Sequence, residues 1–209
     1  GWRSIRFALD RPGLFRRQLR ALLRAGEGRS LSAMFPMVTS AHEFRQAKQM
    51  LLEEVEWGKS RGFKGPSELK IGAMLETPAF AFALEDIAGE VDFVSIGTND
   101  MLQFFHAADR MTPLVSDRYP FVSRPVMRFL AHVFETCQRV GVPVSICGEG
   151  AGRPLEALCL IGLGYRSLSM PGGGIGPVKR MLRSLDLAQF GPAFADLLQK
   201  RDPSLRNGE

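Results

Sequence analysis

The sequence predicts an α/β fold in which parallel strands alternate with helices. Short apolar runs rich in β-branched and aromatic residues recur along the chain, and each leads through a polar or glycine-containing loop into a helical segment. This order of strand, loop and helix occurs five times, without a sequence repeat. Such alternation is typical of parallel strands joined by helical crossovers.

The polar residues that follow the strands are the main functional signal. The clearest strand covers residues 91–96, breaks at Gly97 and leads straight into Thr98, Asn99 and Asp100. In barrels and open α/β sheets, sites form at this end of the strands, although the same four residues also suit an ordinary turn. The expected strands are residues 31–38, 69–75, 91–96, 143–147 and 167–170.

Capping residues set the expected helices. Asp10 as N-cap and Pro12 in the first turn start the first helix, and Gly26 ends it. Ser40 and Glu43 form a capping box for the second helix. The expected helices are residues 11–25, 41–61, 78–87, 101–105, 124–140, 154–161, 177–185 and 187–200.

The glycine-rich stretch 172–176 is interpreted as a tight turn before the helix over 177–185. A phosphate cradle is the alternative, because phosphate sites often follow the last strands of a barrel. The stretch matches neither the Gly-x-Gly-x-x-Gly fingerprint nor a Walker motif, which favours the turn.

Composition and charge indicate an ordinary globular chain. The net charge is +5, and much of it lies in the first thirty residues, where arginines alternate with apolar side chains. We interpret this stretch as an amphipathic helix with a solvated basic face and expect no nucleic-acid partner, although a nucleic-acid interface is the alternative. No run of eighteen apolar residues occurs, so no membrane partner is expected.

The cysteines favour a cytoplasmic protein. Cys137, Cys147 and Cys159 lack metal-type spacing, and no signal peptide precedes them. An odd number of scattered cysteines is typical of a reducing compartment. The abrupt start at Gly1, inside what looks like a motif, suggests a fragment of a longer protein.

Charged residues after the strands suggest a magnesium and phosphate site. Glu76 and Asp100 follow successive strands, and oxygen ligands without nearby His or Cys suit Mg²⁺. Arg110 lies ten residues beyond Asp100, where a guanidinium could hold a phosphate through two hydrogen bonds. The chain can therefore offer both a metal and a phosphate ligand.

Two further residues have open interpretations. Cys147 ends a strand, where its thiol could act as a nucleophile or a proton donor; a buried small apolar side chain is the alternative. His106 follows the predicted site and could be catalytic, but a lone histidine in a loop more often faces solvent. The residues alone leave both questions open.

Motifs along nearly the whole chain resemble one family. They are Gly-Trp-Arg-Ser-Ile-Arg at 1–6, Met-Phe-Pro-Met at 34–37, Met-Leu-Glu-Thr-Pro at 74–78, Ser-Ile-Gly-Thr-Asn-Asp at 95–100, Ala-Ala-Asp-Arg at 107–110, Cys-Gly-Glu at 147–149, Ala-Gly at 151–152 and Leu-Ser-Met at 168–170. The chain resembles the C-terminal, phosphoenolpyruvate-binding domain of enzyme I, the phosphoenolpyruvate–protein phosphotransferases.

The resemblance implies a fold and an activity. The fold is a (βα)₈ TIM-type barrel, left incomplete here because residues 1–209 hold the last five strands with their helices. The upstream strands and the phosphohistidine domain would be absent. The activity moves the phosphoryl group from phosphoenolpyruvate to a histidine of the enzyme's own N-terminal domain and on to a histidine phosphocarrier of the HPr type, releasing pyruvate. A homodimer is also implied, and the fragment alone would be inactive.

The resemblance also implies roles for particular residues. Glu76 and Asp100 match the Mg²⁺ ligands, with Asp100 also near the substrate. Asn99, Arg110 and Arg3 match groups that hold the phosphate and carboxylate of phosphoenolpyruvate. Cys147 matches the acid that protonates C3 of enolpyruvate, and a thiol suits this role because it is neutral at pH 7 and can still donate a proton.

Departures from the family pattern affect the branch and the partner. Met101–Phe104, Gly150–Arg153 and the loop over 111–124 differ from the sugar-system enzymes, which favours the nitrogen-related branch, where a sensory domain precedes the enzyme. Pyruvate phosphate dikinase and phosphoenolpyruvate synthase share the Gly-Thr-Asn-Asp and Cys-Gly motifs and are the alternatives. The family's further arginines would lie before Gly1, so a non-catalytic binding or dimerisation module is a third hypothesis.

Overall fold

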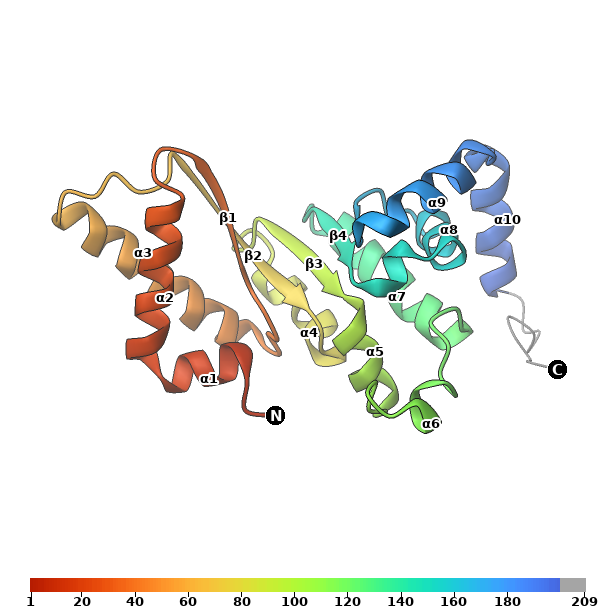
Figure 1. Cartoon of the computed structure of the whole chain (residues 1–209), viewed down its shortest axis with the longest axis horizontal. Helices are drawn as coiled ribbons and strands as arrows, with labels where there is room; N and C mark the ends of the chain where they lie inside the picture. Colours follow the sequence, from red (N-terminus) through yellow and green to blue (C-terminus); the bar gives the residue numbers. More distant parts are fainter. Residues whose placement is uncertain (200–209) are drawn as a thin grey trace. The chain divides into compact units, whose positions relative to one another are not determined.

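Five strands form one sheet. The structure, a computed structural model, describes residues 1–199, and the chain divides into two compact units, Gly1–Val94 and a second that begins at Ser95. The strand order is β1-β2-β3-β4-β5, with β1 parallel to β2 and β4 parallel to β5. The strands are β1 Ser30–Phe35, β2 Glu68–Leu75, β3 Phe93–Gly97 and β4 Val144–Cys147, which are labelled in Figure 1, and the short β5 Leu168–Ser169. All five predicted strands are confirmed, with ends shifted by a few residues.

Helices connect the strands, as the alternating pattern predicts. Among residues 1–199, no helix is both long enough and apolar enough to cross a membrane. The predicted last residue of the final helix, residue 200, lies outside the described residues. The helices are α1 Ser4–Asp10, α2 Pro12–Ala25, α3 Ala41–Ser60, α4 Pro78–Ala83, η1 Glu85–Ile87, α5 Thr98–His106, α6 Pro113–Ser116, α7 Arg124–Arg139, η2 Glu149–Gly152, α8 Pro154–Gly162, α9 Gly172–Arg183 and α10 Leu187–Gln199.

The predicted role of Asp10 is wrong. Residues 4–10 form a helix of their own, so Asp10 ends α1, and the residue before α2 is Arg11, which makes no side-chain capping bond. The Asp10 carboxylate instead accepts a hydrogen bond of 2.6 Å from the indole nitrogen of Trp2. Ser40 is confirmed as the N-cap of α3, because the backbone N–H of Glu43 donates to Ser40 Oγ at 3.2 Å. The reciprocal bond of the predicted capping box is shifted by one residue, since the Glu43 carboxylate accepts the backbone N–H of Thr39 at 2.7 Å.

The glycine-rich stretch is helix rather than a turn. Helix α9 begins at Gly172 and includes the whole stretch. A side chain at Gly174 would place its Cβ 2.9 Å from the backbone of Gly152, so the glycine permits close packing against η2. Local composition suggested a turn because glycine disfavours helices, but here the packing decides the conformation.

Unit 1 is held together by an apolar core and a buried carboxylate. Helices α2 and α3 lie side by side, and their buried side chains include Leu19, Phe44 and Leu51 (Figure 1). Glu54 of α3 is only 1% exposed, and it accepts hydrogen bonds from Arg16 Nη1 at 2.7 Å and from Arg20. The arginine-rich segment is therefore an amphipathic helix, as predicted. Two of its arginines, Arg16 and Arg20, bind the Glu54 carboxylate.

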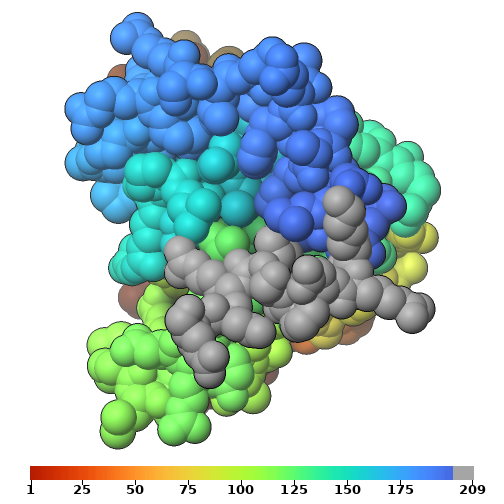
Figure 2. All heavy atoms as spheres, turned by 90° about the vertical axis from the view of Figure 1, so that its right-hand side faces the viewer, coloured from red at the N-terminus to blue at the C-terminus, as the bar shows by residue number. Residues whose placement is uncertain are grey.

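Unit 2 packs its helices around α7 and α8. Helix α7 buries one face, including Val126, Leu130 and Val133, and Tyr165 donates its hydroxyl hydrogen to the carbonyl oxygen of Leu130 at 2.8 Å. Helices α9 and α10, blue in Figure 2, both contact α8. Helices α8 and α9 also contact η2, the segment that follows β4, where part of the candidate site lies.

We predict that Glu54→Ala destabilises unit 1. The substitution leaves two guanidinium groups beside a cavity in place of their carboxylate. Because both arginines are about one third exposed, we expect a loss of roughly 2 kcal/mol in unfolding free energy, below the value typical of a fully buried pair. Urea unfolding of the native chain and the variant measures this difference in unfolding free energy. Glu53→Ala is the matched control, since Glu53 pairs with the same Arg16 on the surface and should matter little.

The Glu54 effect should depend on pH. Burial alone would raise the pKa of Glu54, but hydrogen bonds from Arg20 and Arg16 outweigh it, and the net pKa lies below the ordinary value. A lowered folded-state pKa gives stability that is present above the unfolded-state pKa and is lost as pH falls through the folded-state pKa. The difference between the native chain and Glu54→Ala should therefore shrink below about pH 4. A difference unchanged at acid pH would contradict this assignment.

Candidate functional site

The predicted residues of unit 1 meet at the ends of β1 and β2. Glu76, directly after β2, is 8% exposed, and one of its carboxylate oxygens accepts the backbone N–H of Met37 at 2.7 Å. Arg3, just before α1, donates to the sulfur of Met37 at 3.4 Å. The structure thus places Arg3 and Glu76 around one residue in the loop after β1.

Met37 ends the Met-Phe-Pro-Met motif at 34–37, but the sequence analysis assigned it no role in the site. It is buried and adopts a left-handed backbone conformation with φ of 58°, which is unfavourable for a side chain of its size. Beside it, Thr77 donates its hydroxyl hydrogen to the carbonyl oxygen of Val38 at 3.0 Å. These contacts hold the loop in a strained conformation that places the Met37 N–H against Glu76.

The predicted residues of unit 2 lie at the ends of β3 and β4. Thr98 starts α5 and donates its hydroxyl hydrogen to the carbonyl oxygen of Cys147 at 2.9 Å. Asn99 Oδ1 accepts the backbone N–H of Glu149 at 3.3 Å. The predicted polar cluster is therefore the first turn of a helix, where the partial positive charge of the helix N-terminus stabilises the Asp100 carboxylate.

Two of the predicted residues of unit 2 line an open cavity of about 600 Å³. Asn99 lies on one wall and Arg110 on another, whereas Asp100 and Cys147 are not among its lining residues. The segment that carries Arg110 is fixed in two ways. The backbone N–H of Arg110 donates to Gln103 Oε1 at 3.3 Å. The Asp109 carboxylate accepts a hydrogen bond from the backbone N–H of Met111 at 3.0 Å.

His106 faces this cavity, contrary to the expectation of a solvent-facing loop residue. It ends α5 and stacks on Tyr119 with ring centroids 4.7 Å apart. Burial lowers its pKa, so the imidazole is neutral at pH 7. A helical spacing could have identified it, because positions 99, 102, 103 and 106 follow the i, i+3, i+4, i+7 pattern of one helix face, and all four line the cavity.

The donors fit Mg²⁺ in kind. Glu76 is a buried carboxyl group with one oxygen held by a backbone N–H, and Asp100 is a half-buried carboxyl group at a helix start. Within residues 1–199, no group of three or more His, Cys, Asp or Glu is placed to hold a metal ion. Mg²⁺ commonly takes only one or two carboxylates and completes its shell with water and substrate phosphate. Cys147 is half-buried, and its thiol forms no disulfide.

Sequence comparison links the chain to enzymes that use phosphoenolpyruvate. The family described as "PEP-utilising enzyme, PEP-binding domain" matches residues 1–187. A phosphoenolpyruvate-protein phosphotransferase of Geobacillus stearothermophilus is 42% identical over 185 residues, which are 88% of this chain and 32% of the relative. The corresponding protein of Bacillus subtilis is 40% identical, again with 88% and 32% covered. The chain thus spans about a third of the length of these relatives.

Comparison with solved structures supports the fold. A citrate lyase of Burkholderia xenovorans matches with a TM-score of 0.58 at 16% identity, covering 88% of this chain and 67% of that protein. A pyruvate kinase of Cryptosporidium parvum matches with a TM-score of 0.56 at 14% identity, covering 90% and 37%. At such identities the likeness shows the fold alone. It confirms the predicted α/β architecture of five parallel strands as part of a TIM-type barrel.

We predict that Gly148→Ala disrupts the end of β4. Gly148 has φ of 117°, and a Cβ there would lie 2.2 Å from Thr98 Oγ1 and 3.1 Å from Asn99 Oδ1. The substitution must strain the backbone and push Thr98 away from Cys147, at a cost of roughly 2–3 kcal/mol in urea unfolding. Gly176→Ala is the control, because it lies inside α9 with no neighbour within 4 Å. That variant should gain about 0.5–1 kcal/mol; equal effects of both would contradict the role of Gly148.

Proposed function

Because this chain belongs to the PEP-binding domain family of PEP-utilising enzymes, we propose that it binds phosphoenolpyruvate as part of a phosphoenolpyruvate–protein phosphotransferase. The observation that carries the proposal is the match over residues 1–187, with the family's polar residues at successive strand ends. The named relatives favour this activity over a dikinase or synthase. Since the chain spans about a third of them, the activity belongs to the whole protein.

The substrate is held mainly by cations and an amide. Arg110 and Arg3 offer guanidinium groups that match the geometry of phosphate and carboxylate oxygens. Asn99 adds a neutral side chain at the cavity wall. Glu76 and Asp100 would hold Mg²⁺, with Asp100 also close to the substrate. When bound, the ion neutralises charge on the phosphate and on the developing enolate. The contacts of Met37 and of the first turn of α5 orient these side chains beforehand.

Cys147 supplies the proton that completes the reaction. The bond between phosphorus and the enol oxygen breaks as the phosphoryl group passes to a histidine in the N-terminal part of the whole protein. The electron pair left on oxygen forms the carbonyl, and C3 takes the thiol proton, giving pyruvate and a thiolate. Solvent then restores the thiol. The Thr98 bond to the Cys147 carbonyl fixes the backbone that carries the sulfur.

Further properties complete the proposal. An HPr-type phosphocarrier would accept the phosphoryl group, and the active form would be a homodimer. The departures at 101–104 and 150–153 favour the nitrogen-related branch of the family. Three free cysteines suit the reducing cytoplasm.

We predict that Cys147→Ala separates turnover from binding. In the complete gene product, pyruvate formation from phosphoenolpyruvate should fall about 10²–10⁴-fold, the usual contribution of a general acid, in an assay coupled to lactate dehydrogenase. Binding of phosphoenolpyruvate, measured by calorimetry, should remain close to normal, because the proton moves only during the reaction. Cys159→Ala is the matched control and should keep its activity, because Cys159 is buried on α8 and is not a residue proposed for the site. A loss of binding equal to the loss of rate would contradict the proton-donor role.

A further inference from the structure

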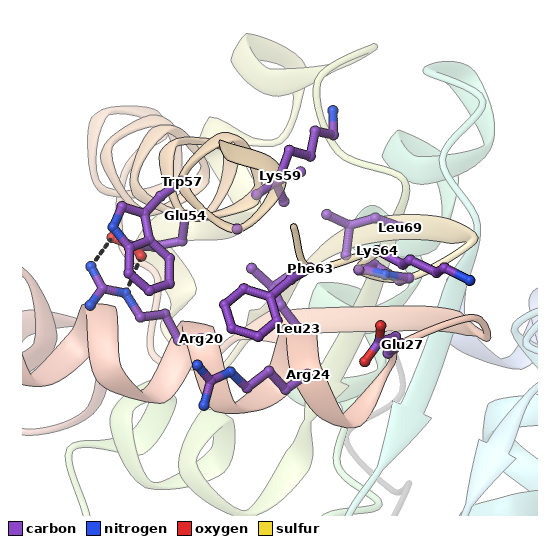
Figure 3. Close-up of a pocket in the computed structure, with 14 residues that line it drawn as sticks. Arg20, Leu23, Arg24, Glu27, Glu54, Trp57, Lys59, Phe63, Lys64 and Leu69 are labelled. Carbon is purple, nitrogen blue, oxygen red and sulfur yellow. Dashed lines mark hydrogen bonds and ion pairs between the residues drawn. The ribbon is translucent and has the colours of Figure 1, made fainter. Parts of the chain in front are cut away.

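Unit 1 has a hollow of its own, at the opposite ends of its strands from Glu76. It lies between α2, α3 and the loop before β2, and it is lined by Glu27, Gly65 and Leu69, which neighbour the starts of β1 and β2 (Figure 3). Strand β2 has eight residues, so its two ends are roughly 23 Å apart. This hollow is therefore distinct from the residues proposed to bind phosphoenolpyruvate.

The walls of the hollow are aromatic and apolar. Trp57 and Phe63 stack with ring centroids 6.3 Å apart and planes 23° from parallel. Leu23, Pro66 and Leu69 complete the wall. The volume is about 180 Å³, close to the roughly 150 Å³ of an apolar cavity that accepts benzene. The hollow therefore fits one planar ring.

Guanidinium groups hold the aromatic rings in place. Arg20 lies over Trp57 with its central carbon 3.8 Å from the ring centroid, and Arg24 lies over Phe63 at 4.5 Å. In Figure 3, Phe63 lies at the centre, with Trp57 and Arg20 to one side and Leu69 and Lys64 to the other. Such cation–π contacts fix the ring faces before any ligand arrives.

The charge at the rim favours an anion. Glu54 contributes little negative charge to the hollow, because Arg16 and Arg20 hold its carboxylate. Arg24 and Lys64 line the hollow as cations, and Glu27 is the carboxylate that opposes them. An anionic group on the ligand can therefore approach Arg24 while the ring enters the apolar wall.

We propose that this hollow binds a small carboxylate built on a single aromatic ring, of which benzoate is the simplest example. The ring would pack against Phe63 and Trp57, and the carboxylate would lie at Arg24. The proposal is independent of the phosphotransferase activity, because no residue is shared between the two sites.

Fluorescence of Trp57 tests the proposal directly. Residues 1–209 contain two tryptophans, so within them Trp2→Phe leaves Trp57 as the single reporter. Titration with sodium benzoate should change its emission saturably. Cyclohexanecarboxylate, which has the charge without the aromatic ring, and benzamide, which has the ring without the charge, should each bind about tenfold more weakly.

Variants of the rim separate specific binding from general adsorption. In the Trp2→Phe background, Arg24→Gln should weaken benzoate about tenfold and Glu27→Gln should tighten it. Arg17→Gln is the matched control, because Arg17 is exposed on the same helix and does not line the hollow.

A variant that fills part of the hollow without unfolding the protein provides a second test. A methyl at Gly58 would lie 3.8 Å from Phe63 Cβ, an ordinary contact, and would intrude on the hollow. Gly58→Ala should therefore weaken benzoate while thermal stability is kept or raised. The proposal is overturned by any of three results: no saturable change, equal benzoate affinity in Arg24→Gln and Arg17→Gln, or equal affinity for benzoate and cyclohexanecarboxylate.

Discussion

In each unit, a side chain that follows one strand hydrogen-bonds the backbone that follows the neighbouring strand. Glu76, after β2, accepts the N–H of Met37 after β1, and Thr98, after β3, bonds the carbonyl oxygen of Cys147 at the end of β4. Parallel pairing makes this possible, because it brings the carboxyl ends of neighbouring strands to the same edge. The candidate site depends on these contacts, since they fix both the functional side chains and the loops around them.

Because of these contacts, the site residues stabilise the fold in addition to their proposed roles in binding and catalysis. Glu76 stabilises the strained Met37 backbone in addition to its proposed role toward Mg²⁺. Gly148 lets Thr98 and Asn99 approach the end of β4, which no residue with a side chain permits. Proteins commonly keep such strain at functional sites, where the surrounding structure holds it in place. A substitution here must therefore be judged by its effects on both folding and binding.

The sequence predicted the strands well, because buried parallel strands are continuous apolar runs that end in polar residues. It also predicted which residues would lie at the strand ends, including Glu76, Asn99 and Cys147. Three features of the structure could not be predicted from the sequence, for physical reasons. The left-handed conformation of Met37 is set by tertiary contacts, and Gly174 of α9 is needed for close packing against Gly152. Asp10 ends a short helix that local capping rules do not reveal. His106 was predicted to follow the helix in a loop, but α5 extends one residue beyond the predicted end at residue 105 and includes it.

The central claim is that the strand ends form a magnesium-dependent site for phosphoenolpyruvate. Calorimetric titration of the complete gene product with phosphoenolpyruvate, with and without Mg²⁺, tests it most directly. We expect tight binding only with Mg²⁺, and we expect Glu76→Gln and Asp100→Asn each to remove the dependence on Mg²⁺ while the protein stays folded. Binding that is equally tight without the metal, or unchanged metal dependence in either variant, would contradict the account.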